Sequence, residues 1–204
     1  RRLHVRTWAG WTRAAWYEWG AYLRLGAPGM LMIAVEWWSF EIVSLLAGWL
    51  GQAELAAQAI VINMLSLAFM PPLGLSVAAS IRVGNFLGAG DHAGARLSAV
   101  ATMTLTAASQ TAIALLLLLG RRGIALAYTD DDRVVELVDS LLLGMAFFVL
   151  PDGTQGVLSG ILRGCGRQLV GGLANVGAYT ALGLPIAFGL TLGTDLGLAG
   201  IWTG

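Results

Sequence analysis

The sequence contains no lysine, and only one cysteine and two histidines occur among its 204 residues. All twelve basic residues are arginines, and twelve acidic residues bring the formal net charge to zero. A chain with this balance lacks the basic surface that nucleic-acid binding requires. Cys165 has no second cysteine with which to form an internal disulfide, so we expect this thiol only to pack against its neighbours.

Charged residues of either sign are scarce. They make up 12% of the chain, whereas 57% of the residues are hydrophobic and the mean hydropathy is +0.73. This composition lies far from that of soluble globular domains. It predicts a membrane protein.

The few charges divide the chain into apolar windows. A helix needs roughly 20 mostly apolar residues to cross the hydrocarbon core. Five windows have this length, three without charge and then two with acids inside: 55–81, 97–120, 168–194, 25–48 and 140–162. A sixth apolar run begins at residue 196, close to the end of the sequence. We therefore expect an all-α membrane protein with five complete transmembrane helices and the start of a sixth. Because no methionine begins the chain, we also expect it to be part of a longer protein.

The arginines predict the orientation of these helices, because cytoplasmic flanks carry an excess of positive residues. One side receives the arginines of residues 1–24 and those that follow the second and fourth helices; the other receives three arginines and most acids. The N-terminus is therefore expected in the cytoplasm, and the acidic side is expected to be solvated surface. Residues 1–20 are rich in tryptophan and arginine, which predicts an interfacial segment on the inner leaflet, or alternatively a sensor of lipid headgroups. Residues 21–204 form the transmembrane bundle.

Three acids lie inside the predicted helices. Glu36 and Asp152 fall near the middle of their windows, where an ionised acid costs about 2.5 to 3.5 kcal/mol. Glu41 follows Glu36 by five residues, about 140° further round a helix, so the two acids serve separate faces. Trp37 precedes Glu41 by four residues and shares its side of the helix. We expect these acids to handle ions, protons or substrate; the alternative is that they cap, pair or face an interface.

Neither acidic window has a basic residue in its interior, so a proton, an incoming cation or another helix must neutralise the acids. Burial favours the protonated form of a carboxyl group, which prepares it to exchange protons. A carboxylate beside an indole attracts organic cations through its charge and through the ring quadrupole.

Prolines interrupt the predicted helices. Pro71 and Pro72 lie in the second, and Pro151 immediately precedes Asp152 in the fourth. Each removes a backbone donor and frees a carbonyl one turn earlier. The freed groups must find partners in neighbouring helices or in a water-filled cavity. These positions are either ordinary kinks or points at which the helices bend during function.

Two glycine-rich connections follow the second and fourth helices, at residues 81–91 and 161–168. Their notable residues are Arg82, Gly84, Gly88 and Gly90, then Arg163 and Gly164. A phosphate-binding loop is excluded, since no strand precedes the glycines and no Lys-Ser or Lys-Thr follows them. We expect tight turns between helices, with the arginines at the lipid headgroups.

At these residues the chain resembles the multidrug and toxin extrusion (MATE) transporters of animals and plants. The runs 76–85 and 87–90 resemble the signature after the family's eighth helix, and 156–160 with 162–166 the one after its tenth. Met32 with residues 36–38 and Glu41 resembles the seventh helix, and residues 183–185 the eleventh. The resemblance implies the C-terminal six-helix bundle of a two-bundle transporter whose N-terminal half is absent from this sequence.

The resemblance implies that the protein is not an enzyme and has no cofactor or bound metal. It implies export of small organic cations, including drugs, in exchange for protons or, less favoured, sodium. The bilayer expected to hold it is the plasma membrane. The residues expected at the site are the acids Glu36, Glu41 and Asp152 and the substrate contacts Trp37, Trp38 and Asn63. Asn63 stands where animal extruders often have an acid, and it cannot titrate.

Three other functions were open from the sequence. An intramembrane aspartyl protease needs paired aspartates, one in a Gly-x-Gly-Asp setting, whereas Asp152 follows Pro151 and the other midspan acids are glutamates. A membrane subunit without transport activity is a second alternative. A lipid or oligosaccharide flippase of the same superfamily is the third, and it would be expected to have a basic cavity for anionic headgroups.

Overall fold

The computed structural model describes residue 17 and residues 19–194 and 197–203. The interfacial segment predicted for residues 1–20 therefore lies outside the described residues, apart from Tyr17, Trp19 and Gly20.

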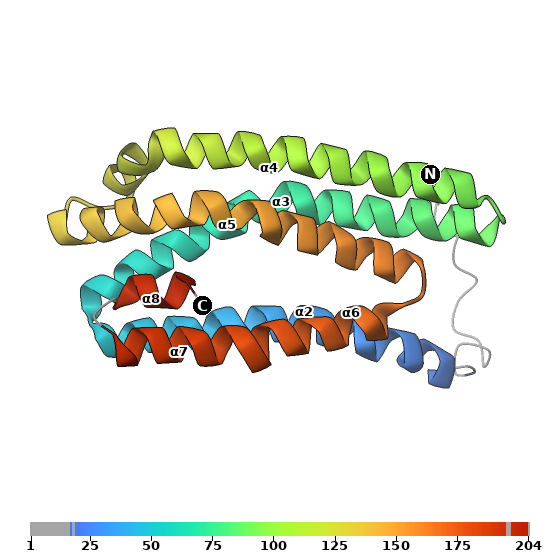
Figure 1. Ribbon diagram of the computed structural model, residues 1–204, viewed down its shortest axis with the longest axis horizontal. Coiled ribbons are helices and arrows are strands. Elements are labelled where there is room, and N and C mark those ends of the chain that lie inside the picture. Colours follow the sequence, from blue (N-terminus) through green and yellow to red (C-terminus); the bar gives the residue numbers. More distant parts are fainter. Residues whose placement is uncertain (1–16, 18, 195–196, 204) are drawn as a thin grey trace, which may run out of the picture.

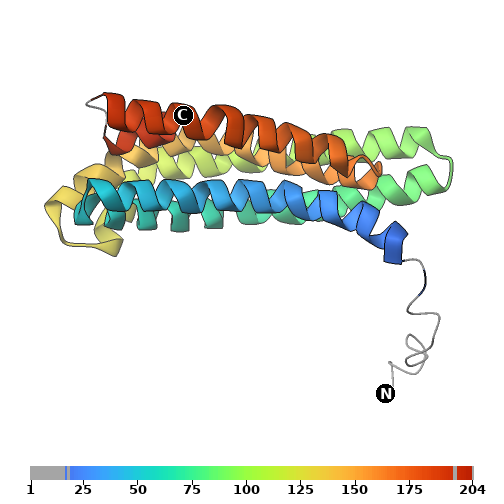
Figure 2. The same cartoon turned by 90° about the horizontal axis from the view of Figure 1, so that it is seen from below.

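Helices make up nearly all of the described chain, and they alternate in direction (Figures 1 and 2). Four are long and continuous: α2 (Trp19–Leu50), α3 (Gln52–Gly88), α4 (His92–Tyr128) and α5 (Asp132–Gly164). The fifth crossing is built from three consecutive pieces, α6 (Gln168–Asn175), the π-helix η2 (Val176–Gly183) and α7 (Leu184–Gly193). A short helix, α8 (Leu198–Thr203), follows.

Five crossings are long and apolar enough to span a membrane, which confirms the predicted fold class. The helices α2, α3, α4 and α5 extend beyond their predicted windows at both ends, because helical hydrogen bonding continues into the flanking polar residues, whereas the fifth crossing matches its window to within one residue. The sixth apolar run has begun as α8, also as predicted. The described chain is thus an all-α bundle of an integral, multi-pass membrane protein.

The helices pack in two layers (Figures 1 and 2). In one layer α5 lies against both α3 and α4, and it is the most buried of the five crossings. In the other layer α2 lies against the crossing formed by α6, η2 and α7. Figure 1 shows that α3 changes direction near its middle, in the segment that contains Pro71 and Pro72, so its first half approaches α2 and its second half lies beside α4. A space bounded by α2, α3, α5 and α6 results.

Glycines spaced four residues apart allow α5 to approach α3 closely. A Cβ atom at Gly156 would lie 2.9 Å from the Phe69 ring, and one at Gly164 would lie 2.7 Å from the Ser80 carbonyl oxygen. A Cβ atom at Gly160 would overlap the Ser76 carbonyl group. Such small-xxx-small spacing is how helices in lipid bring their backbones together. We call Gly156, Gly160 and Gly164 the glycine seam.

The glycine-rich connections predicted at residues 81–91 and 161–168 are largely helical in the structure. Arg82 and Gly84 lie in α3, Arg163 and Gly164 lie in α5, and Gly88 is the last residue of α3. The helical hydrogen bonds continue through both segments until a residue with positive φ ends them: Gly90 at φ 75° and Gly166 at φ 70°. The expectation of loops is thus correct only for the short turns around these two glycines.

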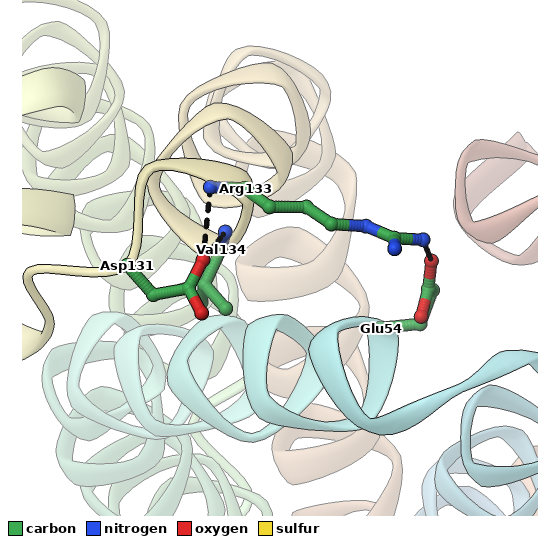
Figure 3. Close-up of polar contacts among 4 residues, drawn as sticks. All are labelled: Glu54, Asp131, Arg133 and Val134. Atoms are coloured by element: carbon green, nitrogen blue, oxygen red, sulfur yellow. Dashed lines mark hydrogen bonds and ion pairs between the residues drawn. The ribbon is translucent and has the colours of Figure 1, made fainter.

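The acidic surface expected at the other end of the bundle has structural roles (Figure 3). The Asp131 carboxylate accepts hydrogen bonds from the backbone N–H groups of Arg133 at 2.9 Å and Val134 at 3.3 Å, and so caps α5. Arg133 Nη2 lies 2.7 Å from Glu54 Oε1, joining the first turns of α5 and α3. The charged residues among these are exposed or partly exposed, as predicted, but the expectation that the acids have no specific role is wrong for Asp131 and Glu54.

Replacing Gly160 with alanine is expected to destabilise the bundle, because the added methyl group meets the Ser76 backbone. Overpacking of this kind typically costs about 1 to 3 kcal/mol. The matched control is Gly144→Ala on the same helix, where a Cβ atom has nothing within 4 Å. Thermal unfolding of the full-length protein in detergent should show a lower midpoint for Gly160→Ala alone. Equal midpoints for the two variants would contradict the close approach at the glycine seam.

Candidate functional site

A cavity of about 160 Å³ lies between α2, α3, α5 and α6. All three predicted acids line it: Glu36 and Glu41 from α2, and Asp152 from α5. We call this space the acidic cavity. The fold thus brings together carboxylates that lie more than a hundred residues apart in the sequence.

Glu36 and Asp152 both line the acidic cavity, and their charges act on each other. Asp152 is buried, with 6% of its surface exposed. Two ionised carboxylates in such an apolar setting repel each other and have lost most of their hydration. Entry of a proton or a cation removes part of that cost, so this pair can couple the binding of one to the release of the other.

The aromatic residues predicted at the site separate into two faces of α2. Trp37 lines the acidic cavity, whereas Trp38 does not and is 72% exposed. Consecutive helical residues point about 100° apart, so both indoles cannot face one cavity. Asn63 is likewise exposed on α3 and does not line it, although its neighbour Ile62 does. The predicted placement of Trp38 and Asn63 beside the acids is corrected for this structure; their contribution to substrate binding stays a prediction.

A layer of uncharged polar residues lies beside the acidic cavity, and the sequence interpretation missed it. Gln155 forms a side-chain hydrogen bond with Glu36, and its Nε2 atom donates to Asn175 Oδ1 at 3.1 Å. Tyr179 on η2 interacts electrostatically with both Glu36 and Asp152, and its ring packs edge-on against Phe40. Polar side chains within apolar windows are a visible signal of such a layer, but their shared face depends on how the helices pack.

Arg163 reaches into the acidic cavity from the last turn of α5. Its Nη2 atom donates to Ser76 Oγ at 2.8 Å, and Ser76 Oγ donates to the Gly156 carbonyl at 2.7 Å. The sequence left open a partner from outside the two acidic windows, and Arg163, one residue beyond the fourth window, is that basic residue. Side chains of a helix point back toward its N-terminus, so an arginine at the C-terminal turn can extend into the bundle.

Gln110 of α4 holds α5 next to Asp152. Its Nε2 atom donates to the Val149 carbonyl at 2.8 Å, and it occupies the space where Gly153 lacks a side chain. This contact lies two residues before Pro151, which cannot donate a hydrogen bond to the preceding turn. The position of the buried acid therefore depends on a third helix as well as on α2 and α3.

Metal binding has little support at the acids. Among the residues that the structure describes, no group of three or more His, Cys, Asp and Glu side chains could hold a metal ion. The donors at the acidic cavity are two interacting carboxylates, a third on the next turn of α2, and neutral amides and hydroxyls. This set combines negative charge with neutral hydrogen-bonding groups in one cavity.

Fold and cavity together define a helical membrane protein with a polar, acid-lined cavity inside its bundle. Residues 28–188 match the model of the MatE family, and the chain belongs to this family.

Proteins with assigned names are similar to this chain over its whole length. It is 40% identical to multidrug and toxin extrusion protein 1 from Danio rerio and to the human protein of the same name, over all 204 residues. It is 39% identical to multidrug and toxin extrusion protein 2 from Mus musculus. The chain spans about a third of the length of these relatives, 35% or 36% of each.

Solved structures show the same fold. A MOP superfamily transporter from Pyrococcus furiosus, described as having a binding pocket of reversed polarity, superimposes with a TM-score of 0.79. An outward-facing multidrug resistance MATE family transporter gives the same score. Each match has 23% sequence identity and covers 89% of this chain and 40% of the other.

Substituting Gln110 with leucine is expected to lower the stability of the bundle. The Val149 carbonyl then keeps its helical hydrogen bond but loses its side-chain donor, and a hydrogen bond of this kind typically contributes about 0.5 to 1.5 kcal/mol. Gln52→Leu, at an exposed position of α3, is the matched control. Both variants of the full-length protein are compared by thermal unfolding in detergent, and a Gln110→Leu midpoint equal to that of the control would show that the contact does not hold α5.

Proposed function

We propose that the full-length protein exports small organic cations across a membrane in exchange for protons. The observation that carries the proposal is the acidic cavity itself, where carboxylates from two helices meet an indole ring in an apolar bundle. Carboxylates supply attraction for a cation, and the ring quadrupole adds to it. The names of the relatives, multidrug and toxin extrusion proteins, support the same function.

The proposed mechanism is alternating access with two ligands that exclude each other. Glu36 is the coupling residue: it binds a proton on one side of the membrane and releases it on the other. Glu41 and Trp37 attract the organic cation, and Asp152 completes the polar surface opposite them. When a proton neutralises Glu36, the cavity loses a negative charge and its hold on the cation weakens, so the cation leaves.

Helix bending provides the motion in this proposal. Pro71 and Pro72 lie inside α3 and Pro151 inside α5, so both helices lack backbone hydrogen bonds close to the acidic cavity. The π-helical segment η2 lies beside the same acids, and π-helices often occur at functional sites. A change in charge at Glu36 and Asp152 therefore acts on the least regular parts of three crossings.

The partners in this proposal are the lipid bilayer, the transported cation, the proton and the remaining part of the transporter. The membrane is proposed to be the plasma membrane, and protons are proposed as the coupling ion ahead of sodium. The family membership supports a protein that is not an enzyme. A flippase for anionic lipids or oligosaccharides is disfavoured, since three acids and one arginine line the cavity.

Glu36→Gln is expected to abolish cation uptake driven by a pH gradient. The amide keeps the size and hydrogen bonding of the side chain but cannot bind or release a proton. The measurement is uptake of a fluorescent organic cation by cells that express the full-length protein, normalised to the amount at the cell surface. Glu136→Gln, an exposed acid outside the cavity, is the control and should retain uptake. Normal uptake by Glu36→Gln would refute the proposed coupling.

A further inference from the structure

Arg163 places a fixed positive charge inside a cavity that is otherwise lined by acids. Among the described residues that line the acidic cavity, Arg163 is the only basic one. The acids there are Glu36, Glu41 and Asp152. The sequence interpretation assigned this arginine to a loop at the lipid headgroups, so its charge was not counted as part of the cavity.

Hydrogen bonds hold the guanidinium group in place without neutralising it. Arg163 donates to Ser76 Oγ at 2.8 Å, and the same oxygen is anchored to the Gly156 carbonyl at 2.7 Å. Ser76 is 2% exposed and lies at the glycine seam, where the two helix backbones touch. Arg163 is therefore tied to a rigid part of the bundle.

The attraction between Arg163 and Glu36 acts through space. Each group lies in the electric field of the other, but no ion pair within 4.0 Å joins them in the part of the chain that the structure describes. The carboxylate thus remains open to an incoming ligand, while the arginine charge still acts on that ligand. In an apolar cavity such an interaction is stronger than in water.

We propose that Arg163 is a specificity-determining residue that selects singly charged organic cations over doubly charged ones. This inference rests on the proposed function and adds a rule for its substrates. The repulsion between a ligand and a fixed charge is proportional to the charge of the ligand. Arg163 therefore opposes a divalent cation twice as strongly as a monovalent cation at the same position.

The test compares two probes in cells that express the full-length protein: tetraethylammonium, which is monovalent, and methyl viologen, which is divalent. Arg163→Gln should lower the KM of both probes, and the KM of the divalent probe should fall further. A fall of about threefold for the monovalent probe corresponds to about ninefold for the divalent probe, because the energies differ by a factor of two. Arg167→Gln, an exposed arginine in the following turn and outside the cavity, should leave both KM values unchanged.

A second variant keeps the charge and changes its position. Ser76→Ala removes the hydrogen bond that holds the guanidinium, so the arginine can move toward the acids. The KM of both probes should then rise, again more for the divalent one. If Arg163→Gln does not reach the cell surface, the rise in both KM values in Ser76→Ala tests the role of Arg163 instead.

The outcomes separate this inference from the function on which it rests. Transport of both probes with an unchanged ratio of KM values in either surface-expressed variant would overturn the role of Arg163 and leave cation exchange standing. If the wild-type protein transports neither probe, both proposals fail. A larger fall in KM for methyl viologen than for tetraethylammonium in Arg163→Gln supports the inference.

Discussion

The α3 and α5 backbones touch because three glycines on α5 carry no side chain at the crossing. This close approach determines much of the site. It places Ser76 within hydrogen-bonding distance of both the Gly156 carbonyl and the Arg163 guanidinium. It also sets the height at which Asp152, one turn before Gly156, enters the bundle. In lipid, where apolar surfaces gain little by associating, such backbone contact is a principal source of helix packing.

The acidic cavity places charge where the bilayer penalises it. A hydrogen bond from Gln155 and the through-space attraction of Arg163 stabilise the Glu36 carboxylate without forming a closed ion pair, whereas the neighbouring charge of Glu36 opposes ionisation of Asp152. A site balanced in this way changes its charge by accepting a proton or a cation, and either event can favour a different arrangement of the bent helices.

Several features were predictable from the sequence because they depend on local pattern. The apolar windows predicted five crossings, since length and hydropathy decide what can span a bilayer. Glu36 and Asp152 were recognisable because an acid in an apolar run stands out. Gly156 and Gly160 lay inside the predicted fourth helix, but Gly164 was expected in a loop, because glycine serves turns and close helix contacts alike.

Other features depend on the packing of distant segments. The spacing of Trp37 from Glu41 placed it on one side of the helix with that acid, but only the rotation of α2 shows that Trp37 lines the cavity and Trp38 does not. Arg163 looked like a headgroup anchor until the length of α5 placed it inside the bundle. Gln110, Gln155 and Tyr179 belong to no distinctive motif, and only the arrangement of four crossings brings them to the acids or to the backbone beside them.

Exchange of a cation for a proton can be observed directly in liposomes that contain the purified full-length protein and a trapped pH indicator. When tetraethylammonium is added outside, with potassium and valinomycin holding the membrane potential at zero, its entry should be accompanied by proton release from the interior. Removing sodium should leave that proton flux unchanged. Cation entry without proton movement, or entry that requires sodium, would contradict the account.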